Sequence, residues 1–428
     1  MSKSSKSFDG FAAFLHYGFR YSFAKAATRA TLPSAQAEVR PAFIGAAVVF
    51  PRAPFPLDGS LSPVYTGKNR LPKGKRSVSP TMYHFESDYV NGTLPQVLDA
   101  LTATNGEETV GYGLDPHCER ARTLIRAACQ APEAQVSFLL GGTQANTTVI
   151  AAALRPHQGV LCAETGHINV HESGAIEATG HKVLPLPAEN GKLSARQIRA
   201  AWTAHWSDVC HEHMVQPGMV YLSQPTEIGT LYSKGELEAI SQVCRECGLF
   251  LYVDGARLSY ALAASDNDLS LPDLARLTDV FYIGGTKTGL LFGEAVVISN
   301  DLLKRDFRYH IKQHGGMLAK GRLLGVQFAA LFTDDLYLQA GRHAINAACR
   351  LQTAFRKAGV PFFADSPTNQ QFVILTKEQQ RLLSQHFIYE YWAKVDGHRD
   401  AVRFCTSWST SDAALEQLEA DLLAMSCQ

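Results

Sequence analysis

The sequence of 428 residues has no long hydrophobic run, no excess of charge of one sign and no dense set of cysteines. Its longest apolar stretch near the N-terminus, residues 42–50, is too short for a membrane span, which needs roughly 18 residues. Basic and acidic side chains number 40 each, so the charge balance gives no reason to expect nucleic acid or an anionic membrane as a partner. These absences are typical of a soluble globular protein.

The nine cysteines are an odd number spread thinly along the chain. That pattern favours free thiols in a reducing compartment, hence a cytoplasmic location, over a disulfide framework. The one close pair, Cys244 and Cys247, lacks a second pair with zinc-ligand spacing, so we interpret both as buried helix cysteines. No G-x-G-x-x-G motif follows a predicted strand, which disfavours a nucleotide-dependent oxidoreductase.

Residues 1–81 differ from the rest of the chain because they hold twelve basic side chains against three acidic ones, and no regular hydrophobic period. One interpretation is a targeting segment, which would send the protein to an organelle. The other is a disordered or non-native extension, with Met82 as the true initiator. The second is favoured because Met82 directly precedes the first segment with a recognisable pattern.

From about residue 133, short apolar runs alternate with helical patterns, which predicts an α/β fold with a mostly parallel seven-stranded sheet. Several runs are continuously apolar, as in strands buried on both faces. The predicted strands are Val136–Leu140, Val160–Ala163, Lys182–Leu186, Met219–Ser223, Leu249–Val253, Val280–Ile283 and Ala295–Ile298. The predicted helices between them are Gln144–Leu154, Asn169–Thr179, Ser194–His205 and Lys234–Cys247, with Ser194 and Ser233 as N-caps.

The chain is longer than one compact domain usually is, so two domains are expected after the basic extension. Residues 82–318 form the predicted large α/β domain and residues 319–428 a smaller C-terminal α+β domain. The smaller domain is predicted from helices at Leu323–Phe332, Ala340–Ala358 and Asp412–Met425 and strands at Phe372–Leu375 and Ala401–Thr406.

Polar groups follow three of the predicted strands, where ligands bind in open α/β sheets. Gly142, Thr143 and Gln144 open a helix after the first strand, and a helix N-terminus with small residues favours a phosphate. Asp254 ends a buried strand and could keep a pyridine nitrogen protonated, with Arg257 three residues on. Lys287 follows another strand after two glycines. Taken singly, they could be an ordinary strand-to-helix turn, a helix N-cap and a surface lysine. Together they predict a pyridoxal phosphate site with Lys287 as the Schiff-base lysine.

The segment Thr165–Glu172 places His167 and His171 four residues apart. A zinc site is conceivable at this spacing, but the glutamate of a zinc-protease helix is absent, so no metal is predicted. We expect His167 to stack on the pyridine ring and His171 to be a structural histidine.

The sequence resembles the low-specificity L-threonine aldolases, within the β-eliminating-lyase-like group of fold-type-I pyridoxal-phosphate enzymes. The resemblance runs from about Phe85 to the C-terminus. It is carried by Phe85–Asp88, Gly111–Pro116, Gly142–Asn146, Glu164–His167, Val253–Arg257 and Gly284–Gly289. It implies a fold-type-I transferase-like architecture, pyridoxal 5'-phosphate as cofactor, and a homodimer or homotetramer.

The resemblance also implies residue roles. The cofactor is expected to be held by Gly142, Thr143, Gln144, His167, Asp254, Arg257, Thr286, Lys287 and Arg322. Ser87, Arg257 and Arg403 are expected to contact the substrate carboxylate. Lys320 and Arg322 are expected near the phosphate, reaching across a subunit interface. Many relatives carry a histidine where this chain has Gln224–Thr230, and Glu227 is expected to take that place.

The expected reaction is retro-aldol cleavage of a β-hydroxy-α-amino acid, such as L-threonine or L-allo-threonine, to glycine and an aldehyde. The base that removes the hydroxyl proton is left open among His167, Glu227 and a water held by either. The nearest alternatives are another pyridoxal-phosphate reaction, β-elimination or racemisation. A non-catalytic binding protein with this fold is a more distant alternative, because the combination of Lys287, Asp254 and Arg257 is intact.

Overall fold

The centre of the described chain is a seven-stranded sheet, seen in a computed structural model that describes residues 82–426. The expectations for residues 1–81 lie outside the described residues. The strand order is β2-β8-β7-β6-β5-β3-β4. The strands are β2 (Gln135–Leu139), β3 (Gln158–Ala163), β4 (Lys182–Leu186), β5 (Gln216–Ser223), β6 (Phe250–Asp254), β7 (Val280–Gly284) and β8 (Glu294–Ile298). All seven strand predictions are confirmed to within a few residues at each end.

The sheet is mostly parallel, as predicted. Strands β3 to β7 pair in parallel, whereas β8 runs antiparallel to both of its neighbours, β7 and β2. Because β3 to β7 share one direction, their carboxyl ends meet at one edge of the sheet. The residues that follow β5, β6 and β7 are therefore brought together there.

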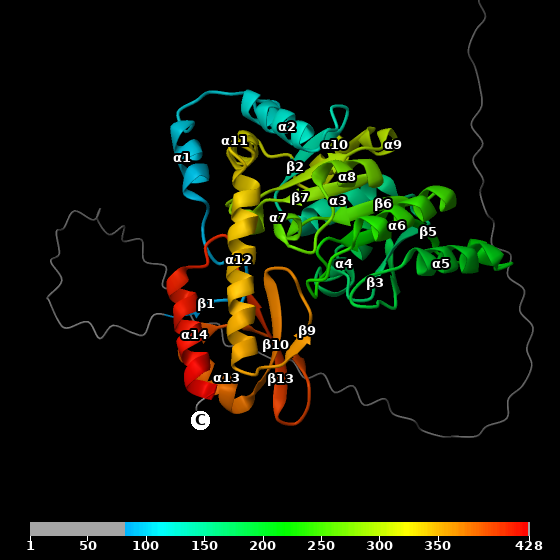
Figure 1. Cartoon of the computed structure of the whole chain (residues 1–428). Coiled ribbons are helices and arrows are strands. Elements are labelled where there is room, and N and C mark those ends of the chain that lie inside the picture. Colours follow the sequence, from blue (N-terminus) through cyan, green and yellow to red (C-terminus); the bar gives the residue numbers. More distant parts are fainter. Residues whose placement is uncertain (1–81, 427–428) are drawn as a thin grey trace, which may run out of the picture. The chain divides into compact units, whose positions relative to one another are not determined.

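Both faces of the sheet are buried, which explains the continuous apolar runs. In β6, Leu251 and Val253 belong to one hydrophobic cluster and Tyr252 to the other. Helices cover both faces (Figure 1). They are α1 (Pro95–Ala103), α2 (Pro116–Ala128), α3 (Gly142–Ala153), α5 (Ala195–Ser207), α6 (Lys234–Cys247), α7 (Leu258–Ala263), α8 (Leu271–Leu277), α9 (Asp301–Lys304), α10 (Phe307–Gln313) and α11 (Arg322–Leu331).

Helix starts follow local side-chain chemistry. Ser194 and Ser233 are confirmed as N-caps, and each forms a reciprocal capping box with the residue three positions on. The predicted helix at 169–179 is wrong. Only α4 (His167–Val170) and a short 3-10 turn at Glu177–Thr179 form, because Ser173 and Gly174 adopt positive φ between them.

The C-terminal part contains a four-stranded antiparallel sheet in the order β12-β13-β10-β9. Its strands are β9 (Phe362–Ala364), β10 (Gln370–Thr376), β12 (Glu390–Lys394) and β13 (Arg399–Cys405), packed with α13 (Lys377–Leu383) and α14 (Asp412–Ser426). The long helix α12 (Leu336–Lys357) packs on α7 near the large sheet and on β10 and α14 (Figure 1). The short strands β1 (Tyr83–His84) and β11 (Phe387–Ile388) pair in parallel.

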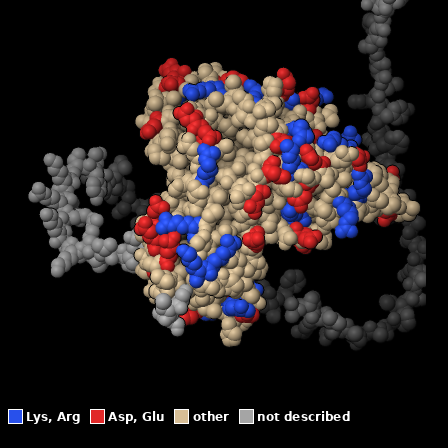
Figure 2. All heavy atoms as spheres, viewed as in Figure 1, with Lys and Arg blue, Asp and Glu red and all other residues tan. Residues whose placement is uncertain are grey.

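The expected domain boundary between residues 318 and 319 stays a prediction. None of the helices between residues 82 and 426 has the length and apolar character that a bilayer crossing demands. On the face shown in Figure 2, acidic and basic side chains are interspersed rather than gathered by sign.

Candidate active site

A cavity of about 250 Å³ lies at the carboxyl ends of β5, β6 and β7. Eight of the predicted residues line it: Gly142, Thr143, His167, Glu227, Asp254, Arg257, Thr286 and Lys287. The structure therefore brings together residues that lie up to 145 positions apart in the sequence. Ser223, Thr226, Tyr282 and Glu294 are further polar residues of its lining.

Lys287 lies in the short 3-10 turn Thr286–Thr288, directly after β7. The two glycines before it allow close packing: a Cβ on Gly284 would lie 2.3 Å from the carbonyl oxygen of Ala256. Burial lowers the pKa of the Lys287 amine, and the nearby Arg257 lowers it further. A lysine with these properties is a better nucleophile near neutral pH than a surface lysine.

The N-terminus of α3 forms one wall of the cavity. Gly141, Gly142 and Thr143 line it, and a Cβ on Gly142 would lie 2.9 Å from the hydroxyl of Tyr282. The side chain of Gln144 points elsewhere: it accepts from Leu140 N at 2.9 Å and donates to His314 O at 2.9 Å. Any contact of Gln144 with a phosphate would therefore come from its backbone N–H.

Asp254 is buried at the end of β6 and receives hydrogen bonds from several donors. The hydroxyl of Tyr282 donates to one carboxylate oxygen at 2.5 Å, and that of Tyr221 donates to the other at 2.6 Å. The backbone of Ala256 donates at 3.0 Å and Asn146 Nδ2 at 3.3 Å. Burial first, and then the carboxylate of Asp254, raise the pKa of both tyrosines, so they remain donors.

His167 is oriented by a buried carboxylate that the sequence did not reveal. Its Nδ1 lies 2.7 Å from Oε1 of Glu172, and the same oxygen accepts from Asn146 Nδ2 at 2.6 Å. Asn146 thus connects Glu172 to Asp254 through one amide nitrogen. The ring of His171 lies 5.5 Å from that of His167, and burial lowers the pKa of His171.

Glu227 follows β5 and lines the cavity. Its Oε1 accepts from Ser223 Oγ at 2.7 Å and from the backbone N–H of His167 at 2.9 Å. Burial raises the pKa of the Glu227 carboxyl. Glu227 and His167 are therefore held together by direct contact, although they are 60 positions apart.

Arg257 forms a two-point ion pair with Asp88, from Nε at 2.6 Å and from Nη2 at 3.0 Å. Asp88 also accepts from Asn369 Nδ2 at 3.0 Å. Burial alone would raise the pKa of Asp88, but Arg257 and Lys287 hold it below its ordinary value. Asp88 lies in the segment that suggested Ser87, yet the ion pair was not predicted.

The remaining predicted residues lie outside the cavity lining. Ser87 is buried, and Arg403 donates to Gln370 Oε1 at 3.0 Å and pairs with Glu390, while its Nε is buried without a partner among the described residues. Arg322 donates to the carbonyl oxygens of Thr104 and Asn105. Lys320 is exposed.

The residues of the cavity fit pyridoxal 5'-phosphate. An amine of lowered pKa, a carboxylate at a neighbouring strand end, an imidazole and a helix N-terminus converge on one space. Gly142 leaves room beside the helix N-terminus that a side chain would fill. We found no group of three or more metal-ligand side chains between residues 82 and 426.

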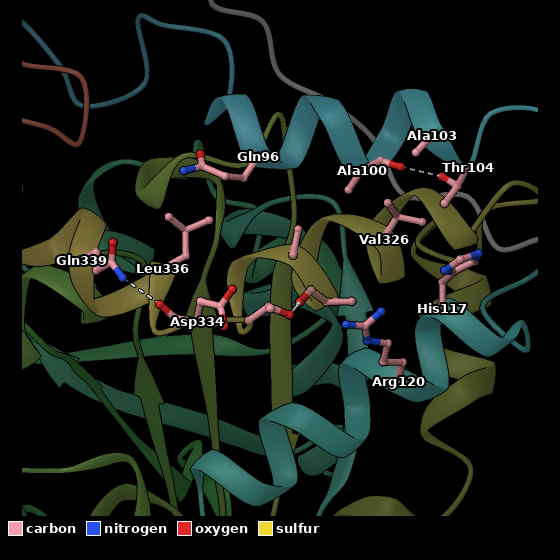
Figure 3. A pocket seen from close by; sticks show the side chains of 13 residues that line it. Gln96, Ala100, Ala103, Thr104, His117, Arg120, Val326, Asp334, Leu336 and Gln339 are labelled. Carbon is pink, nitrogen blue, oxygen red and sulfur yellow. Dashed lines mark hydrogen bonds between the residues drawn. The ribbon is translucent and has the colours of Figure 1, made fainter.

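A larger cavity, of about 400 Å³, lies between α1, α2 and α11 (Figure 3). Four of its thirteen lining residues are alanines, and His117 at one end is bonded to Glu107 at 2.5 Å. It contains none of the predicted site residues. We place the chemistry in the smaller cavity because titratable groups with shifted pKa values converge there.

Comparisons with known proteins show the family of the chain. A model of the β-eliminating lyase family matches residues 84–378. The low-specificity L-threonine aldolase of Pseudomonas aeruginosa is 33% identical over 79% of this chain and 96% of its own length. The structure of Leishmania major threonine aldolase is 43% identical, covers 80% of this chain and 99% of its own, and has a TM-score of 0.78.

A more distant neighbour shows the fold alone. The aspartate aminotransferase of Thermus thermophilus is 14% identical, with a TM-score of 0.59 over 81% of this chain. The predicted fold-type-I architecture is confirmed by both structures.

Proposed function

Since the chain belongs to the β-eliminating lyase family and, within it, to the low-specificity L-threonine aldolases, we propose that it cleaves L-threonine and L-allo-threonine to glycine and acetaldehyde. The cofactor of the reaction is pyridoxal 5'-phosphate. The observation that carries the proposal is the convergence of Lys287, Asp254 and His167 on one cavity.

The residues around the cavity can each be given a task. Lys287 would hold the cofactor through its amine. Gly142, Thr143 and the backbone of Gln144 would hold the phosphate, with Thr286 beside them, and Asp254 would keep the ring nitrogen protonated. The bound cofactor supplies the electron sink for the breaking Cα–Cβ bond.

His167 is our candidate for the base that takes the β-hydroxyl proton. The Nδ1···Glu172 contact fixes the proton on Nδ1, so the free Nε2 is the acceptor. The raised pKa of Glu227 makes its carboxyl a donor at lower pH, suited to binding and orienting the hydroxyl. Their order of importance is therefore His167 first and Glu227 second.

Arg403 is our candidate for holding the substrate carboxylate, with Ser87 in support. The buried Nε of Arg403 is an open donor, and a guanidinium binds a carboxylate through two parallel bonds. Arg257 already donates Nε and Nη2 to Asp88. Its role is therefore to keep its own guanidinium charge and the cavity wall in place.

The test is a pair of product assays on the purified full chain. We expect aldehyde release from L-threonine and L-allo-threonine with matching glycine, visible absorbance of the bound cofactor, and loss of both from Lys287→Ala. Pyruvate release from serine or cysteine without aldehyde from threonine would instead favour a β-eliminating lyase. Absence of visible absorbance would favour a non-catalytic protein.

We also propose a homodimer or a dimer of dimers. Val110, Tyr112 and Leu114 are 64%, 48% and 63% exposed. The backbone N–H of Tyr112 donates to the carbonyl oxygen of Ala319, which is next to Lys320 and close to Arg322 in the sequence. Apolar side chains grouped on a surface are typical of an interface. Lys320 and Arg322 would then approach the phosphate of a neighbouring copy.

A cytoplasmic location is proposed on the cysteines, since the eight in the described part of the chain are all free. If residues 1–81 are a transit segment, the location is an organelle instead. Fractionation of cells that contain the native protein decides between the two locations.

A further inference from the structure

Glu294 is a buried carboxylic acid that the proposed chemistry leaves without a task. It lies at the start of β8, opposite Gly284 of β7 and Leu139 of β2, and it is only 4% exposed. Its Oε2 accepts from the backbone N–H of Gly285 at 3.1 Å, and its Oε1 accepts from the hydroxyl of Thr286 at 2.9 Å. Both partners belong to the segment that carries Lys287.

The contacts of Glu294 fix this segment from two sides. Thr286 Oγ1 donates to Glu294 and also accepts from the backbone N–H of Gly293, which closes a small ring of hydrogen bonds. Burying a carboxylate is unfavourable unless it is bonded or neutralised. A glutamine offers one acceptor oxygen where the carboxylate offers two, so the two loop contacts together favour an acid at this position.

Glu294 and Lys287 line the same cavity and influence each other's charge. Burial raises the pKa of Glu294 to about 8, although the Thr286 hydroxyl and the Lys287 cation lower it. In return, Glu294 is among the groups that raise the pKa of Lys287 against the effect of burial. The other titratable groups that interact with Glu294 are Asp254 on β6 and the tyrosines Tyr252, Tyr282 and Tyr337.

We propose that Glu294 is a positioning residue of Lys287: from the neighbouring strand it anchors the lysine's loop through Gly285 and Thr286, and its carboxylate favours the protonated form of the lysine nitrogen across the same cavity. The proposal rests on the proposed function only in that Lys287 is the cofactor's lysine.

This arrangement has a physical advantage in a buried site. A lysine nitrogen is costly to protonate in a low-dielectric space, and a fixed carboxylate in the same cavity offsets that cost. Tyr252, Tyr282 and Tyr337 cannot supply such a negative charge, because burial keeps their pKa values above the ordinary tyrosine value.

The test is a pH titration of the visible absorbance of the cofactor-loaded full chain, which reports the protonation of the Lys287 nitrogen. In Glu294→Gln we expect the midpoint to fall by about one pH unit or more, a tenfold loss of proton affinity, because a nearby negative charge is removed. Glu246→Gln is the control. It removes an exposed carboxylate on α6 that lies outside the cavity, and its midpoint should match wild type.

An unchanged midpoint in Glu294→Gln, or an equal fall in Glu246→Gln, would overturn the proposal. If Glu294→Gln does not fold, Thr286→Val takes its place, because it removes a donor that favours the ionised carboxylate. Its midpoint should fall in the same direction by a smaller amount, and no fall would be equally decisive. The titration needs bound cofactor but no turnover, so it fails separately from the aldehyde assay.

Discussion

At the scale of single residues, the strand-end groups were predictable and their supporting groups were not. Lys287, Asp254 and Gly142 follow apolar runs, and a run with a polar residue at its end can be recognised in one sequence. Glu172 and Glu294 are ordinary acids in the sequence. Glu172 is important because it bonds to Asn146, 26 positions away, and Glu294 because β8 lies antiparallel beside β7. Neither relation is contained in a local sequence pattern.

The contact between His167 and Glu172 gives a prediction about the base. Glu172→Gln should lower kcat by up to about 10⁴-fold, the loss seen when an imidazole base is held in the wrong tautomer. His167→Ala should lose about 10² to 10⁴-fold, the contribution of a positioned base. Steady-state kinetics with L-allo-threonine measure both.

Glu227→Gln should act differently, mainly by raising KM, because Glu227 binds the hydroxyl rather than taking its proton. If Glu227→Gln has the larger fall in kcat and Glu172→Gln is close to wild type, the base is Glu227. Equal and negligible losses from His167→Ala and Glu227→Gln would remove both residues from the mechanism. Glu246→Gln, an exposed carboxylate on α6, is a suitable control.

At the scale of elements, the pattern of apolar residues predicted the strands of the sheet, because strands buried on both faces are continuous apolar runs. It failed at 169–179, where apolar residues continue at helical spacing but Ser173 and Gly174 take positive φ. It also missed α1 and α2, although Pro116 follows the N-cap Asp115, whose side chain accepts from Cys118 N. The antiparallel direction of β8 could not be predicted, because direction depends on the connection and not on the strand's own residues.

The ion pair of Asp88 and Arg257 joins two elements, the segment after β1 and the turn before α7. We expect Asp88→Asn to lower the free energy of unfolding by about 3–5 kcal/mol at pH 7, since it leaves a buried guanidinium without its charge partner. Urea denaturation measures the loss. The exposed pair Arg381 and Glu378 provides a control, and the stability of Glu378→Gln should stay close to that of wild type.

The same pair predicts a dependence on pH. The pKa of folded Asp88 lies below the unfolded value of about 3.9, so its stabilisation is present at neutral pH. It is lost as the pH falls through the folded pKa, when the carboxylate is protonated. The difference in stability between wild type and Asp88→Asn should therefore narrow in acid. A difference that stays constant from pH 7 to pH 3 would contradict the assignment.

At the scale of the whole molecule, the apolar side chains of the segment 110–114 are the strongest sign of a further contact. Val110 and Leu114 are both more than 60% exposed, and the backbone next to them is bonded to the loop before α11. Exposure of this kind in a chain with interspersed surface charge is better explained by a second copy than by solvent. Sequence patterns cannot reveal it, because an apolar residue looks the same in a core and in an interface.

We therefore expect the protein to sediment as a dimer or tetramer and Leu114→Glu to weaken the assembly at least about 30-fold, the effect of losing about 2 kcal/mol at an interface. Val209→Glu is the matched control, because Val209 is 96% exposed in a different segment and its variant should sediment like wild type. If Lys320 and Arg322 reach the neighbouring site, the dissociated variant should also bind pyridoxal phosphate more weakly. A Leu114→Glu variant that dissociates but keeps its cofactor affinity would separate the two ideas, leaving the interface and removing the shared phosphate contact.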